Sequence, residues 1–293
     1  LIYCFFFIPK KSIIYVYHPP IFLGLTACLL KKIKKVKILY DIQDFWPDAL
    51  VATNIIKNNV FIKVLNYICF SVYKYVDKIN VLSPGFKKKL VKKGISKSKI
   101  SIIYNWADIK KLEDSLLSKK LVKSPFTKNN HFDILYSGNI GPAQSIDTIL
   151  NCALKLLEKN SRIRFIIVGS GIEKEILYQK AKNLKISNVI FFDRVSMVEI
   201  GNYFLNADAF IVHLKDQPIF EITIPSKMQA YMAFGKPIIM AVKGDAANLF
   251  KKSKSGVIAL PEDTNSIVKA AETLSNLSKK DLYQLSLNAS VFY

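Results

Sequence analysis

The chain has 293 residues, which is long enough for two α/β domains that each bury a core. Apolar residues make up 51% of it and charged residues 22%, a composition that excludes an intrinsically disordered protein. The cysteines lie far apart and form no CxxC pair, which argues against a disulfide framework or a zinc site and fits a reducing compartment. They are Cys4, Cys28, Cys69 and Cys152.

The net charge is +21, and most of it lies in the first part of the chain. Residues 1–125 contain 23 Lys, no Arg and 7 acidic residues, a net +16, whereas the remainder carries +5. Long apolar stretches accompany the lysines, and no Arg-rich run or RNA-binding signature does. We therefore interpret the charge as attraction to an anionic membrane surface and not to nucleic acid. A compositional bias that places lysines on solvated faces is the alternative.

The N-terminal residues predict a strand, a turn and a helix. The longest uncharged run, 12–30, has about the length of a membrane span, but two prolines in its middle would break a spanning helix. We expect a buried strand, a proline turn at 18–20 and a buried helix over 22–32. Residues 1–11 lack an initiator Met and a signal-peptide layout. They read as the interior of a domain, so the first domain is expected to be incomplete.

Strand and helix signals then alternate along most of the chain. In the first half, apolar strands are predicted at 35–41, 78–82 and 99–105, with helices at 58–76 and from Pro84. Residues 110–130 lose the strand pattern and become polar, which predicts a linker. We therefore expect a first domain over 1–112, a linker over 113–130 and a second domain over 131–293.

The second half repeats the alternation of buried strands and helices. Continuous apolar strands that alternate with helices indicate a parallel sheet covered on both faces. The fold class is therefore α/β, with two doubly wound, Rossmann-like domains and a ligand cleft between them at the carboxyl ends of the strands. The strands are expected at 133–138, 162–169, 188–193, 208–214, 236–242 and 256–260.

The segment FEITIPSKMQAYMAFGKPIIM, 220–240, carries the most chemistry. Pro225 and Ser226 open a predicted helix, whose free backbone N–H groups would suit a diphosphate. Glu221 precedes the helix and Gln229 lies within it, eight positions later. Both side chains could bind sugar hydroxyls. Ordinary helix capping and an exposed amide explain the same spacing.

This segment resembles the Glu-x7-Glu motif of the family 4 retaining glycosyltransferases, which have the GT-B fold. The resemblance implies that Glu221 holds the donor sugar and that Gln229 stands where a second Glu usually binds the ribose. An amide can donate and accept at a ribose hydroxyl, so altered but not abolished binding is expected. The sequence PSKMQAYMAFGKP resembles the same segment in a branch of this family that transfers N-acetylated deoxy-sugars, such as N-acetyl-fucosamine, in O-antigen or capsule assembly.

Further segments extend the resemblance through the second half. YSGNIGPAQSIDTIL resembles the first strand, turn and helix of the family's donor domain, and IIVGSGIEKEI resembles the second. The first turn has no basic residue, although many members carry Arg and Lys there, so Lys227 or Arg194 is expected to supply the charge. The resemblance implies that Gly138, Asn139, Gly141, Gln144 and Gly169 lie near the diphosphate and that Arg194 and Val195 border a uracil-type base.

In the first half, YDIQDFWPDALV resembles the family's "HDLWPE" segment, and Gln43 takes the place of its His. Gln43 cannot titrate near neutrality, so it is expected to bind a hydroxyl and not to act as a general base. His18 is predicted to be a satisfied turn residue, and Trp46 and Trp106 to pack in the core or at a hinge. No DxD-type acidic pair or His/Asp cluster is present in the sequence, so neither a metal nor a cofactor is expected.

By this resemblance, the intact enzyme moves a sugar from a nucleotide-diphosphate donor to a polyprenyl-diphosphate-linked saccharide, with retention, in bacterial surface polysaccharide synthesis. The donor's own phosphate would take the acceptor proton. The expected location is cytoplasmic, peripheral at the inner face of the plasma membrane, where the basic first half and the helix at 58–76 would dock. A helix that crosses back to the first domain is expected after residue 293. The alternatives are a sugar-nucleotide epimerase of the same fold and an inactive remnant that binds nucleotide sugar or membrane.

Overall fold

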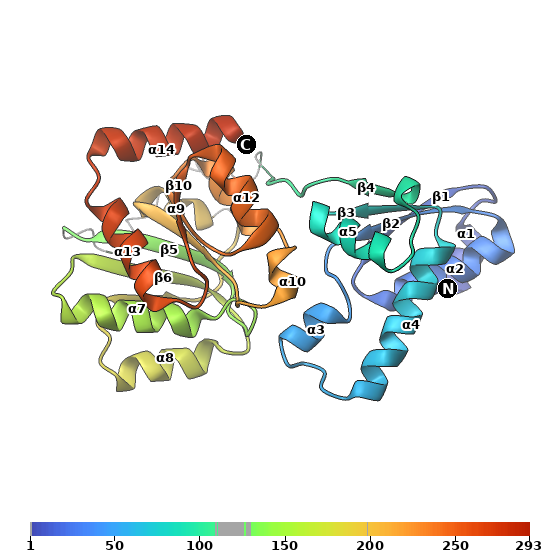
Figure 1. The fold of residues 1–293 in the computed structure, drawn as a ribbon, viewed down its shortest axis with the longest axis horizontal. Coiled ribbons are helices and arrows are strands. Elements are labelled where there is room, and N and C mark those ends of the chain that lie inside the picture. Colours follow the sequence, from blue (N-terminus) through green and yellow to red (C-terminus); the bar gives the residue numbers. More distant parts are fainter. Residues whose placement is uncertain (1, 109, 111–125, 127–129, 198) are drawn as a thin grey trace. The chain divides into compact units, whose positions relative to one another are not determined.

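The computed structural model describes residues 2–108, 110, 126, 130–197 and 199–293 (Figure 1). They form two compact units. Unit 1 comprises Leu1–Asn105 together with Gln217–Ile224, and unit 2 comprises Trp106–Asp216 together with Pro225–Tyr293. The predicted linker, 113–130, lies outside the described residues except at 126 and 130, so the predicted domain boundaries stay predictions.

Unit 1 contains a parallel sheet whose described strands follow one another in chain order, β1-β2-β3-β4. Strand β1 therefore lies at one edge of the sheet that the described residues form. The strands are β1 (Ile13–His18), β2 (Lys37–Ile42), β3 (Lys78–Val81) and β4 (Ile100–Ile102). The helices are α1 (Ile2–Phe7), α2 (Ile21–Lys34), α3 (Asp48–Ala52), α4 (Asn59–Tyr75), α5 (Pro84–Lys92), the 3-10 turn η1 (Lys97–Lys99) and α10 (Pro218–Glu221).

Local capping explains where the helices of unit 1 begin. The Asn58 side chain accepts hydrogen bonds from the backbone N–H groups of Val60 and Phe61, at 2.9 and 3.1 Å, and so starts α4. The Ser83 hydroxyl caps α5 in the same way, with Pro84 in the first turn. The proline-interrupted run of uncharged residues folds as β1, a turn and α2, which confirms the predicted order of elements. The predicted burial is wrong on one side of each element, since Ile13, Tyr15 and Phe22 are 73%, 58% and 67% exposed.

Several aromatic side chains in the first half of the sequence are exposed. The start of the chain forms α1, in which Tyr3 and Phe6 are 72% and 73% exposed. Trp106 is 76% exposed, so it does not pack in a core. It lies beyond β4, where unit 2 begins, and its packing at a hinge stays a prediction. Trp46 is half-buried, and the edge of its ring faces His18, with the centroids 5.6 Å apart.

Unit 2 contains a second parallel sheet, in the order β10-β9-β8-β5-β6-β7. The chain builds outward from β5 to β7, then returns to the other side of β5 and builds outward again, which is the doubly wound arrangement. The strands are β5 (Phe132–Asn139), β6 (Ile163–Ser170), β7 (Val189–Phe192), β8 (Ala209–His213), β9 (Ile238–Ala241) and β10 (Gly256–Ala259). The helices are α7 (Ile146–Glu158), α8 (Lys174–Asn183), α9 (Ile200–Asn206), α11 (Ser226–Phe234), α12 (Gly244–Ser253), α13 (Thr264–Ser275) and α14 (Lys279–Phe292).

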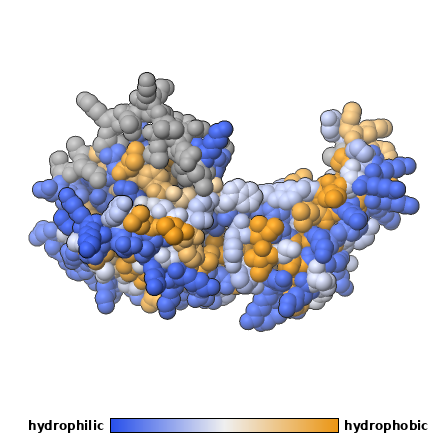
Figure 2. Space-filling view, turned by 90° about the horizontal axis from the view of Figure 1, so that it is seen from above, coloured by the Kyte–Doolittle hydropathy of each residue, from blue (hydrophilic) through white to orange (hydrophobic). Residues whose placement is uncertain are grey.

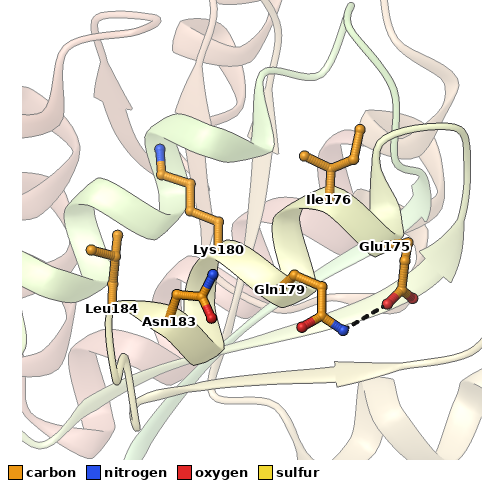
Figure 3. A pocket seen from close by; sticks show the side chains of 6 residues that line it. All are labelled: Glu175, Ile176, Gln179, Lys180, Asn183 and Leu184. Atoms are coloured by element: carbon orange, nitrogen blue, oxygen red, sulfur yellow. Dashed lines mark hydrogen bonds between the residues drawn. The ribbon is translucent and has the colours of Figure 1, made fainter.

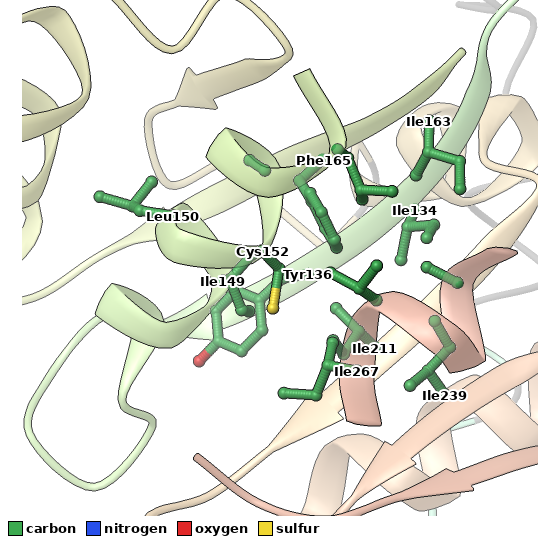
Figure 4. Close-up of a cluster of buried hydrophobic side chains, with 14 of the residues drawn as sticks. Ile134, Tyr136, Ile149, Leu150, Cys152, Ile163, Phe165, Ile211, Ile239 and Ile267 are labelled. Carbon is green, nitrogen blue, oxygen red and sulfur yellow. The ribbon is translucent and has the colours of Figure 1, made fainter. Parts of the chain in front are cut away.

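Helices cover both faces of this sheet. On one face, α7 and α13 pack over a large aliphatic core that includes Ile134, Phe165, Ile211 and Ile239 (Figure 4). On the other face, Phe204 of α9 and Tyr231 and Phe234 of α11 form an aromatic cluster with Phe210 of β8. Each fully buried side chain of this size contributes about 2 kcal/mol, so these two layers fix the sheet and its loops.

A charged pair is buried between the first two strands of unit 2. Arg164 donates from Nε to Asp133 Oδ1 at 2.7 Å and from a terminal nitrogen to Oδ2 at 3.0 Å. The Asp133 side chain is 0% exposed and that of Arg164 8%, and the two residues are direct neighbours in the β5–β6 ladder. The two-point geometry satisfies both carboxylate oxygens, as burial of a charged pair requires.

Candidate functional site

The candidate site lies at the carboxyl ends of the unit 2 strands, near the point where the strand order reverses. In doubly wound sheets, ligands bind in the crevice at this switch point. Two glycines shape the approach to it. Gly138 has a φ of +133°, which L side chains rarely adopt. A Cβ on Gly169 would lie 1.9 Å from the Gly138 carbonyl oxygen, so only glycine lets the two strand ends come this close.

A pocket of about 390 Å³ opens beside these glycines. It brings together five of the residues that the sequence predicted for donor binding, from three separate strand ends and loops: Gly138, Asn139, Gly169, Arg194 and Val195. The lining is completed by Ser137, Val168, Ser170, Met197 and Ile200. The pocket therefore combines exposed backbone of β5 and β6, an apolar border and one guanidinium group, which suits a flat ring attached to an anion.

The turn between β5 and α7 is uncharged. The Asn139 side-chain amide donates to Gln144 Oε1 at 3.2 Å. A Cβ on Gly141 would lie 2.9 Å from Asn139 Nδ2, so a larger residue there would displace this amide. The structure thus places these three predicted residues side by side in the turn, and it describes no basic side chain among them.

Helix α11 begins next to this region with Pro225 as its N-cap and an exposed Ser226 at its first position. Gln229 is only 7% exposed, and its amide faces the backbone carbonyls of Pro225 and Ser226. With its nitrogen turned toward them, it donates to these oxygens at 2.8 and 3.0 Å. The amide is therefore occupied by its own helix start, and its proposed contact with a ribose stays a prediction.

Lys227 is the second residue of α11, and its ammonium is unusual. The residue as a whole is partly accessible, but its Nζ atom is buried and has no hydrogen-bond partner among the described residues. Nζ lies 3.8 Å from the centroid of the Tyr136 ring and 3.5 Å from the position that a Cβ on Gly138 would take. Burial lowers the pKa of Lys227 to about 7.

Glu221 ends the short helix α10 and is exposed. It belongs to the segment Gln217–Ile224, which packs with unit 1, where the Ser83 hydroxyl donates to the Ile222 carbonyl. The carboxylate is therefore available to a ligand, and its proposed role at the donor sugar stays a prediction.

In unit 1, Gln43 is fixed by hydrogen bonds on both sides of its amide. Its nitrogen donates to Asp41 Oδ2 at 2.6 Å, and its oxygen accepts from Asn105 Nδ2 at 2.8 Å. Asp41 is 3% exposed and also accepts from Asn80 Nδ2 at 2.7 Å. Sequence reasoning missed Asp41, Asn80 and Asn105. The available signal was that polar residues end or follow neighbouring strands, since Asp41 and Asn80 are paired in the β2–β3 ladder.

Two further titratable groups of unit 1 have shifted pKa values. Tyr15 donates to the same Asp41, and burial together with this hydrogen bond raises the pKa of Tyr15 to about 12. His18 is fully buried, and its Nδ1 lies 3.0 Å from the Tyr40 hydroxyl. Burial lowers the pKa of His18 to about 4, so its ring is neutral at pH 7. The prediction of a fully satisfied turn residue is wrong, because Nε2 is buried without a partner among the described residues.

A second, shallower pocket lies on the outer surface of α8 (Figure 3). Its lining is helical and includes Ile176 and Lys180, with Gln179 donating to Glu175 at 2.9 Å. It lies on a single helix and away from the strand ends, so we assign no function to it. Within the described ranges, no group of three His, Cys, Asp or Glu side chains could hold a metal ion. None of the helices described is long and apolar enough to cross a membrane.

Similar solved structures show the fold. The crystal structure of Anabaena Alr3699/HepE in complex with UDP has a TM-score of 0.73 at 15% identity, covering 94% of this chain and 72% of that one. Staphylococcus aureus TarM, in a crystal structure that also contains UDP, has a TM-score of 0.70 at 13% identity, covering 99% of this chain and 54% of that one. The expected α/β fold with two Rossmann-like, parallel-sheet domains, as in GT-B proteins, is therefore confirmed.

Two curated relatives match most of this chain at low identity. One is named as the Escherichia coli (strain K12) colanic acid biosynthesis glycosyl transferase WcaI, 24% identical over 225 residues. The other is an uncharacterized 41.2 kDa protein in the cps region of Klebsiella pneumoniae, 24% identical over 250 residues. The matches cover 74% and 85% of this chain but only 54% and 64% of the relatives.

The family assignment comes from residues 118–289, which match the family described as "Glycosyl transferases group 1". The matched segment covers more than half of the 293 residues and contains the glycine turns, the pocket and α11. The chain therefore belongs to the glycosyl transferases group 1 family.

Proposed function

We propose that unit 2 binds a nucleotide-diphosphate sugar and that the intact protein transfers its sugar with retention. The pocket beside Gly138 and Gly169 carries this proposal, because it joins an apolar border for a base, with Arg194 and Val195, to exposed backbone that can approach a diphosphate. The similar Anabaena protein was crystallised with UDP and with UDP-glucose, which supports a uridine donor.

In this proposal, one set of residues binds the diphosphate leaving group and another binds the sugar. Gly138, Asn139, Gly141 and Gln144 surround the diphosphate, and the N-terminus of α11 at Pro225 and Ser226 stabilises its developing charge. Gln229 contributes at the ribose. The partners that we assign to the donor at this end of the sheet also include Gly169, Arg194, Val195 and Lys227.

The sugar is held by Glu221, whose carboxylate stabilises positive charge on the reacting carbon. Gln43 binds a hydroxyl and cannot accept a proton. Its hydrogen bonds to Asp41 and Asn105 hold the side-chain amide in one orientation. The acceptor proton therefore passes to the departing diphosphate. No protein base, metal or cofactor is required for this step.

We further propose an N-acetylated deoxy-hexose as the sugar and a polyprenyl-diphosphate-linked saccharide as the acceptor. The resemblance of 225–237 to N-acetyl-fucosamine-type transferases supports the first. The polysaccharide names of the curated relatives support a role in capsule or O-antigen synthesis. The protein would work in the cytoplasm, peripherally bound at the inner face of the plasma membrane.

Helix α4 supplies the surface for such binding. Val60, Val64 and Tyr67 recur at helical spacing along one side of it and are 71%, 48% and 74% exposed. Exposed lysines accompany this stripe, at Lys63 and Lys74. On the face that the space-filling view presents, other hydrophobic residues lie among hydrophilic ones (Figure 2). An apolar stripe edged by lysines matches a surface of anionic lipid.

Calorimetric titration with UDP and with UDP-N-acetyl-sugars tests the donor site. We expect both ligands to bind and Glu221→Ala to weaken the UDP-sugar by about tenfold or more, while leaving UDP unchanged, because the lost hydrogen bonds involve only the sugar. Glu175→Ala, which removes an exposed carboxylate from α8, is the matched control. Absence of binding by both ligands would refute the proposed function.

The family assignment does not favour the epimerase that the sequence left open. Incubation of the chain with UDP-N-acetyl-sugars in the absence of acceptor separates the two activities. An epimerase would form a new UDP-sugar, whereas a transferase leaves the donor unchanged or releases UDP.

A further inference from the structure

The amine of Lys227 occupies a position that would be unfavourable for a lysine without a ligand. A buried ammonium is normally paired, because it loses its hydration when the protein folds. Here the described residues offer Nζ no hydrogen-bond acceptor, only the face of the Tyr136 ring at 3.8 Å. Cation–π contact compensates for only part of the lost hydration.

The titratable groups around Lys227 do not neutralise it. Tyr136 faces it from β5 and stays protonated, since burial raises its pKa well above the usual range. His213 faces it from the end of β8, and burial lowers the pKa of this ring. His213 accepts from the Glu262 backbone N–H through Nε2, at 3.0 Å, and so donates from Nδ1 to the Gln144 carbonyl at 2.7 Å, which fixes it as the neutral form.

Lys227 Nζ pairs with no carboxylate of the described residues, and the Glu262 carboxylate, which acts on the neighbouring His213, has other partners. Both oxygens of Glu262 accept hydrogen bonds, one from the Ser145 hydroxyl at 2.9 Å and the other from the Asp216 backbone N–H at 2.7 Å. Lys227 therefore lies at the switch point, between the ends of β5 and β8, as a basic group without a counter-ion. Next to it are the free N–H groups at the start of the nine-residue helix α11.

We propose that Lys227 is the counter-charge for the donor's diphosphate at this switch point and that it takes up one proton from solvent when the donor binds. The inference rests on the proposed function. It explains how the uncharged β5–α7 turn can serve an anion. It also gives Gly138 a second role, since Gly138 lines the pocket and any Cβ there would lie only 3.5 Å from Nζ.

The proton balance is simple. The free protein holds the amine largely neutral above pH 7, because burial lowers the pKa of Lys227 to about 7. The diphosphate favours the ammonium form and raises this pKa, so a new N–H bond forms with a proton from the buffer. Donor affinity should therefore be highest below pH 7 and decrease by up to tenfold per pH unit above it. Release of the diphosphate returns the proton.

Calorimetry of the full chain with UDP-N-acetylglucosamine at pH 8 measures this proton directly. The ligand itself does not titrate there, unlike UDP, whose terminal phosphate has a pKa near 6. Binding enthalpies in phosphate and in Tris, which have very different ionisation enthalpies, should differ by the uptake of 0.5 to 1 proton, roughly, per ligand. Uptake near zero by a protein that binds the ligand would overturn the proposal and leave the donor site intact.

Three variants complete the test. Lys227→Met should lose the proton uptake and at least tenfold in affinity, whereas Lys227→Arg should keep most of the affinity but take up no proton, because a guanidinium is always charged. Lys251→Met, at an exposed lysine of α12, should behave like the unaltered protein. Unchanged affinity in a folded Lys227→Met protein contradicts the proposal. If that variant does not fold, Lys227→Arg and the uptake of the unaltered protein still decide.

Discussion

Gly169 is the residue at which the smallest change should have a large effect. Its Cα hydrogen points at the Gly138 carbonyl, and the Cβ of an alanine would lie 1.9 Å from that oxygen. Because the obstacle is backbone and not a flexible side chain, the strand ends must separate. We expect Gly169→Ala to lower the free energy of unfolding by about 2 kcal/mol or more and to weaken UDP binding.

Urea unfolding measures this effect, with Gly94→Ala as the comparison. Gly94 has a φ of +87° but open space around its Cα, so its substitution costs only the backbone strain, about 1 kcal/mol. Equal losses in the two variants would mean that the close approach at Gly169 relaxes without cost.

Lys227 should also make stability depend on pH. In the folded protein its pKa is lowered to about 7 by burial, whereas in the unfolded chain it has the ordinary value of 10.5. Between these values the unfolded chain binds a proton that the folded protein does not, so the free energy of unfolding rises with pH, by up to about 1.4 kcal/mol per unit. Below pH 7 both states are protonated and this contribution is constant.

Urea unfolding at pH 7, 8 and 9 checks this rise. Lys227→Met should lack it, and should be at least as stable as the unaltered protein at pH 7, since an unpaired buried amine is removed. Parallel curves for the two proteins would show that the amine is hydrated in the folded state.

For single residues, the sequence predicted which residues line the pocket better than it predicted which side chains contact one another. The glycine turns and the Arg194–Val195 pair meet in one pocket, because each directly follows an apolar strand and parallel strands end at one edge. The hydrogen bond between Asn105 and Gln43 could not be predicted, since Asn105 is 62 positions away and only the fold brings it near. The burial of Lys227 Nζ depends equally on how α11 packs over Tyr136.

At the scale of elements, the β5–β6 ladder depends on its buried charges. Asp133→Ala leaves the Arg164 guanidinium buried without its carboxylate, and we expect a loss of about 3–5 kcal/mol in the free energy of unfolding. Arg164→Ala should behave similarly.

A double-mutant cycle isolates the pair. The variant with both alanines should lose clearly less than the sum of the single losses, because each single loss already includes the same two hydrogen bonds between Asp133 and Arg164. Additive losses in urea unfolding would instead mean that water reaches one of the partners after a single substitution.

The helices and strands were predictable where one sequence signal, an apolar run or a capping residue, marks the element. Continuous apolar runs become β6 and β8, and capping residues such as Ser83 and Asn58 begin helices. The failures lie where apolar residues do not report burial. The uncharged run 12–30 predicts burial, but Ile13, Tyr15 and Phe22 are exposed in β1 and α2, and a hydrophobic sequence alone cannot indicate what covers it.

At the scale of the whole molecule, charge and apolar surface combine. The net charge of +21 should attract the chain to anionic vesicles, and the α4 stripe should then hold it there. We expect the chain to sediment with vesicles that contain phosphatidylglycerol but not with pure phosphatidylcholine, and to be released by high salt.

Substitutions in the stripe separate attraction from docking. Val64→Glu with Tyr67→Glu should weaken vesicle binding about tenfold, since two exposed apolar side chains are lost and two negative charges added. Ile176→Glu on α8, where the isoleucine is 70% exposed, is the control and should have little effect. Equal sedimentation with neutral and anionic vesicles would sink the docking proposal.

The Asp133–Arg164 pair has a consequence for what changes in chain length the protein can accept. These residues face each other in the same ladder that places Gly138 opposite Gly169, five positions further along, about 17 Å away. Inserting or deleting one residue between 133 and 138, or between 164 and 169, would keep either the charges or the glycines matched, but not both. The interiors of β5 and β6 should therefore tolerate exchange of one aliphatic residue for another but no insertion or deletion.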